Sequence, residues 1–241
     1  IRSLGATAIQ LDNQSWQISG KGLISTDIEY LLGRRLRASI LLLGPLLARF
    51  GSSRLPHPGG CVIGKRPVGT HFEAMRALGA TIEHAGDYYI GRVSKLKGSY
   101  LYLDEVSVTA TENAVMAAVL AEGQTTIRPA ALEPHVVNLC QLLIAMGAKI
   151  EGVGTHTLIV DGQNILHGAS HRVNSDEIET GTYAVAAAIT GGELTLTNVP
   201  ADLDPIVYKL REMGVKAELF DDNLIVKRGE KLTATKIQVD S

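Results

Sequence analysis

Two kinds of apolar pattern alternate along this chain, and most changes from one to the other fall at a glycine. Stretches with apolar residues at helical spacing are followed by short runs rich in β-branched residues. Glycine adopts a positive φ without strain and is common just past a helix end. We therefore predict helices that end before a glycine at residues 72–78, 136–146 and 205–213, followed by Gly79, Gly147 and Gly214; the same phrase surrounds Gly5.

A second set of helical stretches is rich in alanine and leucine. The first covers residues 36–50, and the second begins near Ser107 and runs through Glu122. A glycine again closes each stretch, and a β-like run comes next. The glycines are Gly51, Gly123 and Gly191, and the predicted strands are 53–55, 125–127 and 193–197.

Both kinds of helix-glycine-strand phrase recur about every 70 residues, out of phase with each other. This indicates a supersecondary unit of βαβαββ order, used three times with part of a fourth. The period is longer than that of typical solenoid repeats. We therefore predict the α/β (α+β) class and a closed, threefold pseudo-symmetric domain rather than an open array.

The predicted passage from one repeat into the next lies between Asn174 and Thr182. We expect residues 1–174 to form most of one domain and residues 175–241 to start a second, similar domain. The chain begins with Ile1 rather than methionine, and residues 236–241 stop within a strand-like run. We therefore expect it to be a piece of a longer protein.

Composition narrows the possible partners. The 241 residues are 45% hydrophobic and carry a formal charge of −2, with acids and bases mixed throughout, so we expect no nucleic-acid partner. The longest apolar stretch, residues 38–48, is far shorter than a membrane span, and no signal peptide is apparent. The two cysteines, Cys61 and Cys140, lack metal-ligand spacing, so we expect no metal and a reducing cytoplasm.

The segment 58–68 (Pro-Gly-Gly-Cys-Val-Ile-Gly-Lys-Arg-Pro-Val) places Cys61 on a glycine-rich loop before Lys65 and Arg66. Glycines bring backbone N–H groups close to a ligand, and the two cations complement phosphate or carboxylate. Cys61 is the reactive candidate in an anion site. From residue types alone, a turn that carries an inert thiol is an equally good interpretation.

Three arginines lie at the start of the predicted helix 36–50, where the helix dipole favours anions over cations. For Arg34 and Arg35 we prefer the interpretation that they are solvated. Arg37 stands at the boundary between polar and apolar residues and is a candidate for contact with a bound phosphate. His57 and His71 flank the loop, and the sequence assigns neither a role.

The segment 107–113 (Ser-Val-Thr-Ala-Thr-Glu-Asn) lies at a predicted strand-to-helix junction, where free N–H groups and hydroxyls can bind a diphosphate. An ordinary helix N-cap explains the same residues, and from sequence alone we prefer the cap. The acids of segment 175–179 have the same two interpretations. Cys140 lies at an apolar helix position, which indicates a packing role.

Several motifs together resemble the UDP-N-acetylglucosamine 1-carboxyvinyltransferases, a family of enolpyruvyl transferases. They are Arg37-Ala-Ser-Ile with segment 44–51, the cysteine loop 58–68, segment 116–123, Glu133-Pro134, and Asp176 with segment 178–182. The resemblance covers essentially the whole chain. It implies an inside-out α/β barrel fold with two domains of three βαβαββ units each and an active site in the cleft between them.

The resemblance also implies the chemistry. Members of this family transfer the enolpyruvyl group of phosphoenolpyruvate to the 3′-hydroxyl of UDP-N-acetylglucosamine, the first committed step of peptidoglycan precursor synthesis, without a cofactor. Cys61 matches the loop cysteine proposed as general acid toward C3 of phosphoenolpyruvate, which is also the target of fosfomycin. Arg37 and Arg66 match arginines that bind phosphoenolpyruvate or its phosphate. The segment of Arg66, Pro67 and Val68 matches the one that holds the uridine, and Ser107 and Val108 match the diphosphate segment.

Some family positions differ or are absent. Gly69-Thr70 stands where the family has an acidic residue and leucine, Thr109 replaces a glycine, and Glu177 replaces a basic residue. The family's lysine-asparagine pair, its aspartate base and a further arginine fall outside this chain. Two alternatives therefore stay open. One is a noncatalytic paralogue that binds a nucleotide sugar; the other is a 3-phosphoshikimate 1-carboxyvinyltransferase, although that enzyme does not use such a cysteine.

Overall fold

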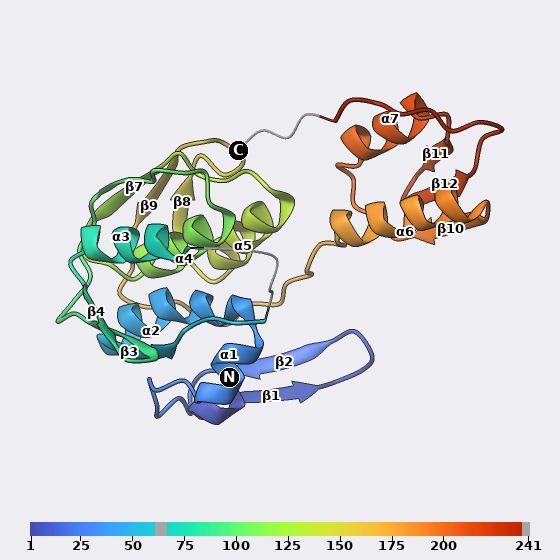
Figure 1. Cartoon of the computed structure of the whole chain (residues 1–241). Helices are drawn as coiled ribbons and strands as arrows, with labels where there is room; N and C mark the ends of the chain where they lie inside the picture. Colours follow the sequence, from blue (N-terminus) through green and yellow to red (C-terminus); the bar gives the residue numbers. More distant parts are fainter. Residues whose placement is uncertain (61–66, 238–241) are drawn as a thin grey trace. The chain divides into compact units, whose positions relative to one another are not determined.

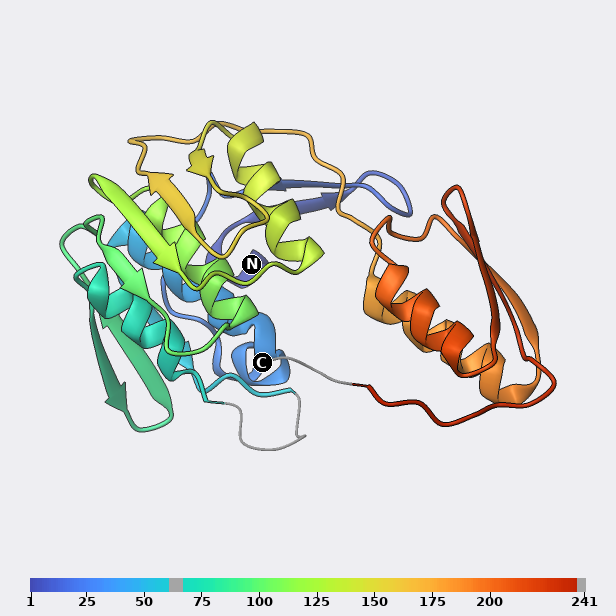
Figure 2. The same ribbon diagram turned by 90° about the horizontal axis from the view of Figure 1, so that it is seen from above.

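A computed structural model describes residues 1–60 and 67–237 of the chain. The chain divides into two compact units, residues 1–171 and 172–241 (Figures 1 and 2). Both units contain helices and strands, in agreement with the predicted α/β class. Among the described residues, no helix is long and apolar enough to cross a membrane.

The first unit contains three sheets. A hairpin of β1 (Thr7–Gln10) and β2 (Trp16–Ser19) follows the short 3₁₀ helix η1 (Arg2–Leu4). The second sheet has the order β3-β5-β4, with bounds Ser52–Pro56, Tyr88–Arg92 and Thr81–Ala85. The third has the order β6-β7-β9-β8, with bounds Tyr100–Tyr102, Gln124–Arg128, Leu158–Asp161 and Lys149–Glu151.

The strand order confirms the repeated unit. In the third sheet, β6 runs parallel to β7, and β7, β9 and β8 then pair antiparallel. The second sheet has the same order, and a parallel bridge between Asp27 and Arg54 takes the place of the first strand. In each copy, helical segments also lie both before and after the first long strand. The order of strands and helices in the third sheet is the predicted βαβαββ.

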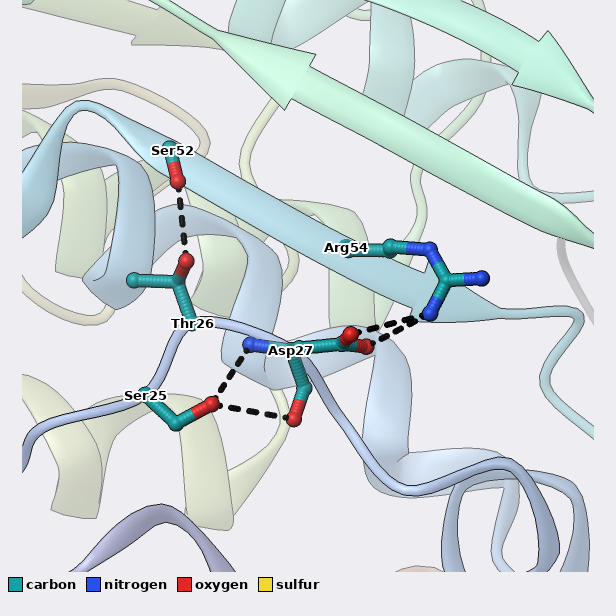
Figure 3. A network of polar contacts seen from close by, with 5 residues as sticks. All are labelled: Ser25, Thr26, Asp27, Ser52 and Arg54. Carbon is teal, nitrogen blue, oxygen red and sulfur yellow. Dashed lines mark hydrogen bonds and ion pairs between the residues drawn. The ribbon is translucent and has the colours of Figure 1, made fainter.

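Polar side chains hold the Asp27 bridge in place (Figure 3). Arg54 donates from Nη1 to both carboxylate oxygens of Asp27, at 3.0 and 2.9 Å. The hydroxyls of Thr26 and Ser52 lie 2.8 Å apart, and the Ser25 hydroxyl accepts from the Asp27 amide at 3.1 Å. Two backbone hydrogen bonds of 2.9 Å form the bridge itself, from the Arg54 amide to the Thr26 carbonyl and from the Ile28 amide to the Arg54 carbonyl, and the side chains reinforce it.

Helix α4 (Val108–Ala118) is the centre of the first unit. It contacts α2 (Leu43–Phe50), α3 (Gly69–Ala77) and α5 (Pro134–Ala145), and it is buried along nearly its whole length (Figure 1). Ala114, Val115 and Ala118 are fully inaccessible. Small side chains let the neighbouring helices approach closely, so the helices form the interior and the sheets lie outside them.

The predicted helix 36–50 is wrong as one continuous helix. Helix α1 (Tyr30–Arg35) precedes it, the 3₁₀ helix η2 (Arg37–Leu42) follows, and α2 starts only at Leu43. A continuous helix would place Pro45 in its interior, where proline has no N–H and clashes with the preceding turn; in α2 it lies in the first turn, which tolerates proline. Arg34 and Arg35 therefore lie in the last turn of α1, where the helix dipole favours cations.

Helix α4 also ends earlier than predicted, at Ala118 rather than Glu122. Glu122 instead forms a parallel bridge with Lys97 and an ion pair of 2.7 Å with Lys95. Gly123, with φ of 88°, follows this turn rather than the helix itself. The predictions for Gly51, Gly79, Gly147, Gly191 and Gly214 are confirmed, since all five have positive φ and lie at or just after a helix end.

The second unit is smaller. Helices α6 (Glu177–Thr190) and α7 (Asp204–Glu212) pack on one sheet of order β10-β12-β11, with bounds Glu193–Thr197, Asn223–Lys227 and Lys216–Phe220 (Figure 2). This strand order matches β3-β5-β4 and β7-β9-β8 of the first unit. The core contains Ala184, Leu203, Val207, Leu224 and Val226. Asp176 caps α6 by accepting from the amides of Ile178 and Glu179 at 2.8 and 3.0 Å.

Candidate active site

The described residues on both sides of segment 61–66 lie close to Arg37. On one side, a Cβ built on Gly60 would lie 3.1 Å from the Arg37 amide nitrogen. On the other side, Arg37 donates from Nη2 to the Pro67 carbonyl oxygen at 3.2 Å. Two candidates from the sequence, Arg37 and Pro67, are therefore in direct contact. The described residues that flank segment 61–66 thus meet near one half-buried arginine.

The glycines before Cys61 are required by this close packing. Gly60 has φ of 92°, and Gly59 approaches the Arg34 carbonyl so closely that a side chain there would clash with it. A side chain on Gly60 would also crowd the Arg35 carbonyl, with the Cβ at 2.8 Å. The backbone of 59–60 thus lies against the link between α1 and η2. Gly60 has the positive φ that favours glycine, and both positions leave no space for a side chain; Cys61 and Arg66 lie outside the described residues.

A buried polar network lies next to Arg37. His71, in the first turn of α3, is 3% exposed, and its Nε2 lies 3.1 Å from the Thr109 hydroxyl. Asn113 of α4 lies 3.1 Å from His71 Nδ1, donates to the Ile40 carbonyl at 3.0 Å, and accepts from the Gly44 amide at 2.7 Å. This network connects η2, α2, α3 and α4.

The protonation state of His71 follows from its surroundings. Burial, and then the nearby charge of Arg37, lower the pKa of His71 from 6.5 to about 4. The ring is therefore neutral at neutral pH. Because Asn113 Nδ2 can only donate, Nδ1 of the ring accepts, and Nε2 carries the proton that is donated to Thr109. Both ring nitrogens then have a hydrogen-bond partner.

Aromatic rings support the base of the loop. His57 stacks on Tyr89 with centroids 4.4 Å apart, and Phe72 packs against the other side of the cluster, 4.5 Å from Tyr89. His84 of β4 brings its Nε2 to 2.7 Å from that of His57. Burial raises the pKa of Tyr89, and the charge of Arg37 opposes this shift. The aromatic cluster thus borders the same arginine.

The second candidate segment begins α4. Ser107 is the N-cap, and its hydroxyl accepts from the Ala110 amide at 3.4 Å, so the capping interpretation is confirmed. The helix start still offers N–H groups without intrahelical partners at its first turn. Thr70 donates to Glu105 at 3.0 Å, and His71 contacts Thr109. These two contacts connect the start of α3, where Val68 is the N-cap, to the start of α4.

The departures at 69, 70 and 109 have structural explanations. Gly69 is the first residue of α3, and a side chain there would meet no atom within 4 Å. Thr70 and Thr109 use their hydroxyls in the contacts just described. Glu177 lies in the first turn of α6, where an acid complements the helix dipole. None of these residues disturbs the local fold.

The second cysteine has an inert environment. Cys140 in α5 is 1% exposed, in agreement with its predicted packing role. Burial, and then the nearby Glu112, raise the pKa of the Cys140 thiol to about 11. Burial also raises the pKa of Glu112. Cys140 is therefore a neutral thiol at physiological pH, without the thiolate that nucleophilic chemistry needs.

The sequence suggested Arg37, Pro67, Val68, Ser107 and Val108 as binding candidates but assigned no role to His71 or Asn113. Their contacts join positions 42 and 69 residues apart in the chain, and no local pattern marks them. Within residues 1–60 and 67–237, no group of three or more His, Cys, Asp or Glu side chains is arranged to hold a metal ion. The chemistry available here is binding of an anion by arginine and backbone N–H groups.

Comparisons with known proteins find relatives over most of the chain. The family model of EPSP synthase (3-phosphoshikimate 1-carboxyvinyltransferase) matches residues 1–241. The chain is 48% identical over 206 residues to a UDP-N-acetylglucosamine 1-carboxyvinyltransferase of Nitratidesulfovibrio vulgaris, covering 85% of this chain and 49% of that protein. A protein of the same name from Acidobacterium capsulatum is 44% identical over 214 residues, covering 88% and 49%. The chain thus spans about half the length of these curated relatives.

Solved structures show the same fold. The enolpyruvyl transferase NikO from Streptomyces tendae superimposes with a TM-score of 0.77 at 22% identity, covering 95% of this chain and 56% of that one. An EPSP synthase from Acinetobacter baumannii gives a TM-score of 0.68 at 23% identity, covering 95% and 54%. At these identities the likeness concerns the fold, which agrees with the predicted enolpyruvyl-transferase-like architecture.

Proposed function

The chain belongs to the EPSP synthase (3-phosphoshikimate 1-carboxyvinyltransferase) family, and from this premise we propose that it is part of a UDP-N-acetylglucosamine 1-carboxyvinyltransferase. The reaction moves the enolpyruvyl group of phosphoenolpyruvate to the 3′-hydroxyl of UDP-N-acetylglucosamine and releases phosphate. The observation that carries the proposal is the position of Arg37, which bonds to Pro67 on one flank of the cysteine segment and lies close to Gly60 on the other. The 48% identity to a relative of this name supports the choice of substrate.

The proposed steps balance without a cofactor. The sugar 3′-oxygen bonds to C2 of phosphoenolpyruvate and loses its proton to a base, while C3 gains a proton from an acid. The tetrahedral intermediate then loses a proton from C3 and releases phosphate as the C2–O bond to phosphate breaks. We assign the acid to Cys61, as the family resemblance implies. The base, which the same resemblance places outside this chain, comes from the remaining part of the protein.

The binding residues have distinct tasks in this proposal. Arg37 and Arg66 bind phosphoenolpyruvate or its phosphate, because the planar guanidinium forms paired hydrogen bonds with such anions. Pro67 and Val68, next to Arg66, hold the uridine. Ser107 and Val108 face the diphosphate with the unpaired N–H groups of the α4 start. The contacts between the starts of α3 and α4 support the placement of uridine and diphosphate on neighbouring segments.

We further propose the setting that these substrates imply. UDP-N-acetylglucosamine is a precursor of peptidoglycan, so the enzyme acts in cell-wall synthesis and bears on cell shape and division. Both substrates are small and anionic, and no nucleic-acid or membrane partner is needed. Because the chain has two cysteines without metal-ligand spacing, we place the protein in the reducing cytoplasm.

The test uses the protein that carries this chain at the full length of its relatives. It is incubated with fosfomycin, with and without UDP-N-acetylglucosamine, and the adduct is mapped by intact and peptide mass spectrometry. We expect one adduct on Cys61 that forms faster with the nucleotide sugar. Cys61→Ser is expected to abolish the adduct, and the matched variant Cys140→Ser to leave it unchanged.

Phosphate release distinguishes the alternatives. With phosphoenolpyruvate, the wild-type protein is expected to release phosphate when UDP-N-acetylglucosamine is added and not when shikimate 3-phosphate is added. Release with shikimate 3-phosphate alone would overturn the proposal in favour of the shikimate enzyme. Binding of the nucleotide sugar without adduct or turnover would indicate the noncatalytic paralogue.

A further inference from the structure

We propose that Thr70, His71, Glu105 and Thr109 form a positioning device that holds the uridine and diphosphate segments in register. We name the two side-chain contacts Thr70–Glu105 and His71–Thr109 the α3–α4 bridge. The inference rests on the proposed function, because it assigns a role in binding the nucleotide sugar. None of the four residues needs to touch the ligand.

The geometry of the bridge carries the inference. Val68 is the N-cap of α3 and Ser107 the N-cap of α4, so the two proposed binding segments are the starts of two helices. Thr70 and His71 follow Val68 within one turn, and Thr109 follows Ser107 by two residues. Hydrogen bonds of 3.0 and 3.1 Å therefore join the two helix starts next to the ligand segments.

The inner half of the bridge is rigidly supported. His71 is 3% exposed, and its second nitrogen bonds to Asn113, which is itself fully buried and bonded to η2 and α2. A ring with both nitrogens engaged has no freedom to rotate or flip. The neutral state of His71, set by burial, keeps one nitrogen as acceptor and one as donor.

Kinetic constants can distinguish a role of the bridge in substrate binding from a role in the chemical step. Segments that contact the uridine and diphosphate bind substrate and transition state equally, so misplacing them raises KM and leaves kcat nearly unchanged. A residue needed only for folding would change the amount of active protein, and therefore apparent kcat, instead. The readout is therefore the change in KM compared with the change in kcat.

The experiment uses the full-length protein and measures the Kd for UDP-N-acetylglucosamine by calorimetry, together with KM and kcat. Thr109→Val removes the hydroxyl while keeping the shape, and Thr109→Ser keeps the hydroxyl. We expect about tenfold weaker binding and higher KM for Thr109→Val, with kcat within twofold, because one hydrogen bond is worth about that factor. Thr109→Ser is expected to restore binding to within about twofold of wild type.

The exposed half of the bridge gives a second test that does not endanger folding. Thr70→Val is expected to weaken binding severalfold, and Thr81→Val is the matched control, since Thr81 donates to the Arg92 carbonyl at 3.2 Å away from the site. Unchanged Kd in both Thr109→Val and Thr70→Val, with a wild type that binds, would overturn the bridge and leave the proposed function standing. A wild type that binds no nucleotide sugar would overturn both.

Discussion

At the scale of single residues, His71 shows how the fold determines charge. Its ring is buried and bonded on both nitrogens, which excludes the extra proton of an imidazolium. The sequence placed it beside the cysteine loop without a role. Its function follows only from the contacts with α4, which connect the loop flank to the interior.

We predict that His71 makes the fold sensitive to acid. The unfolded ring binds a proton below about pH 6.5, whereas the folded ring resists it down to about pH 4. As pH falls through this window, the unfolded state gains a proton that the folded state lacks, so stability is lost, on the order of 3 kcal/mol in total. The difference between the free energies of urea unfolding at pH 7 and pH 4.5 measures this loss.

The matched variants for this prediction are His71→Gln and His167→Gln. His71→Gln is expected to have a lower free energy of unfolding at pH 7. It is also expected to lose less of that free energy between pH 7 and pH 4.5, because the titrating group is absent. His167 is exposed, so His167→Gln is expected to lose as much unfolding free energy as wild type between pH 7 and pH 4.5. An equal loss of unfolding free energy on acidification in all three proteins would contradict the assignment of a neutral, buried His71.

Cys140 gives a second prediction at this scale. Its thiol is 1% exposed and its pKa is raised to about 11, so a maleimide or epoxide is expected to modify it at least a hundredfold more slowly than an unfolded thiol. Mass spectrometry after labelling, with and without denaturant, measures this difference. Rapid labelling of Cys140 in the native state would show that the α4–α5 contact opens frequently.

At the scale of elements, the contact between α2 and α4 depends on Gly44. A Cβ at this position would clash with the Asn113 side chain and lie 2.5 Å from its carbonyl oxygen. We predict that Gly44→Ala destabilises the first unit by about 2 to 4 kcal/mol, because overpacking exceeds the gain in helix propensity. The midpoint and slope of urea unfolding measure the change.

Gly181→Ala is the control for Gly44→Ala. Gly181 lies within α6, and a Cβ there would meet only Ile206 side-chain atoms, at 3.3 Å or more. A flexible side-chain end moves aside easily, so the alanine is expected to be neutral or to stabilise α6 by up to about 1 kcal/mol. A large loss of stability in this control would show that the difference between the two glycines is not steric.

Sequence reasoning predicted elements better than contacts. Helix ends at glycine are local, because only backbone φ decides them, and the predictions at Gly79, Gly147 and Gly214 are confirmed. The division of residues 36–50 into η2 and α2 does not follow from the apolar pattern, which is continuous there; Pro45 is the only local signal of the break. The network of His71 and Asn113 could not be predicted, since its partners meet only after the helices pack.

At the scale of the whole molecule, helix α6 has an apolar surface that its own unit leaves uncovered. Ile178, Val185 and Ile189 are 70%, 47% and 64% exposed and lie at helical spacing on one face, while the buried Ala184 and Ala187 lie on the opposite face. An exposed apolar stripe of this kind promotes association.

We therefore predict that the isolated chain self-associates through this face. The double variant Val185→Lys and Ile189→Lys is expected to reduce association in analytical ultracentrifugation at least severalfold, with a urea midpoint close to that of wild type. The matched control replaces the exposed Phe220, on β11, with lysine. Equal reduction by this control would indicate a general charge effect rather than a specific face.

The repeated strand order has a consequence for how the chain folds. In all three copies, the strand pairs that close the sheet lie about thirty residues apart, as between Leu55 and Tyr89, Thr125 and Val160, and Leu196 and Leu224. Such modest separations keep the contact order of each copy low, so each sheet pays little loop-closure entropy of its own. During synthesis from the N-terminus, each copy can therefore form its sheet after it leaves the ribosome and before the next copy has been synthesised.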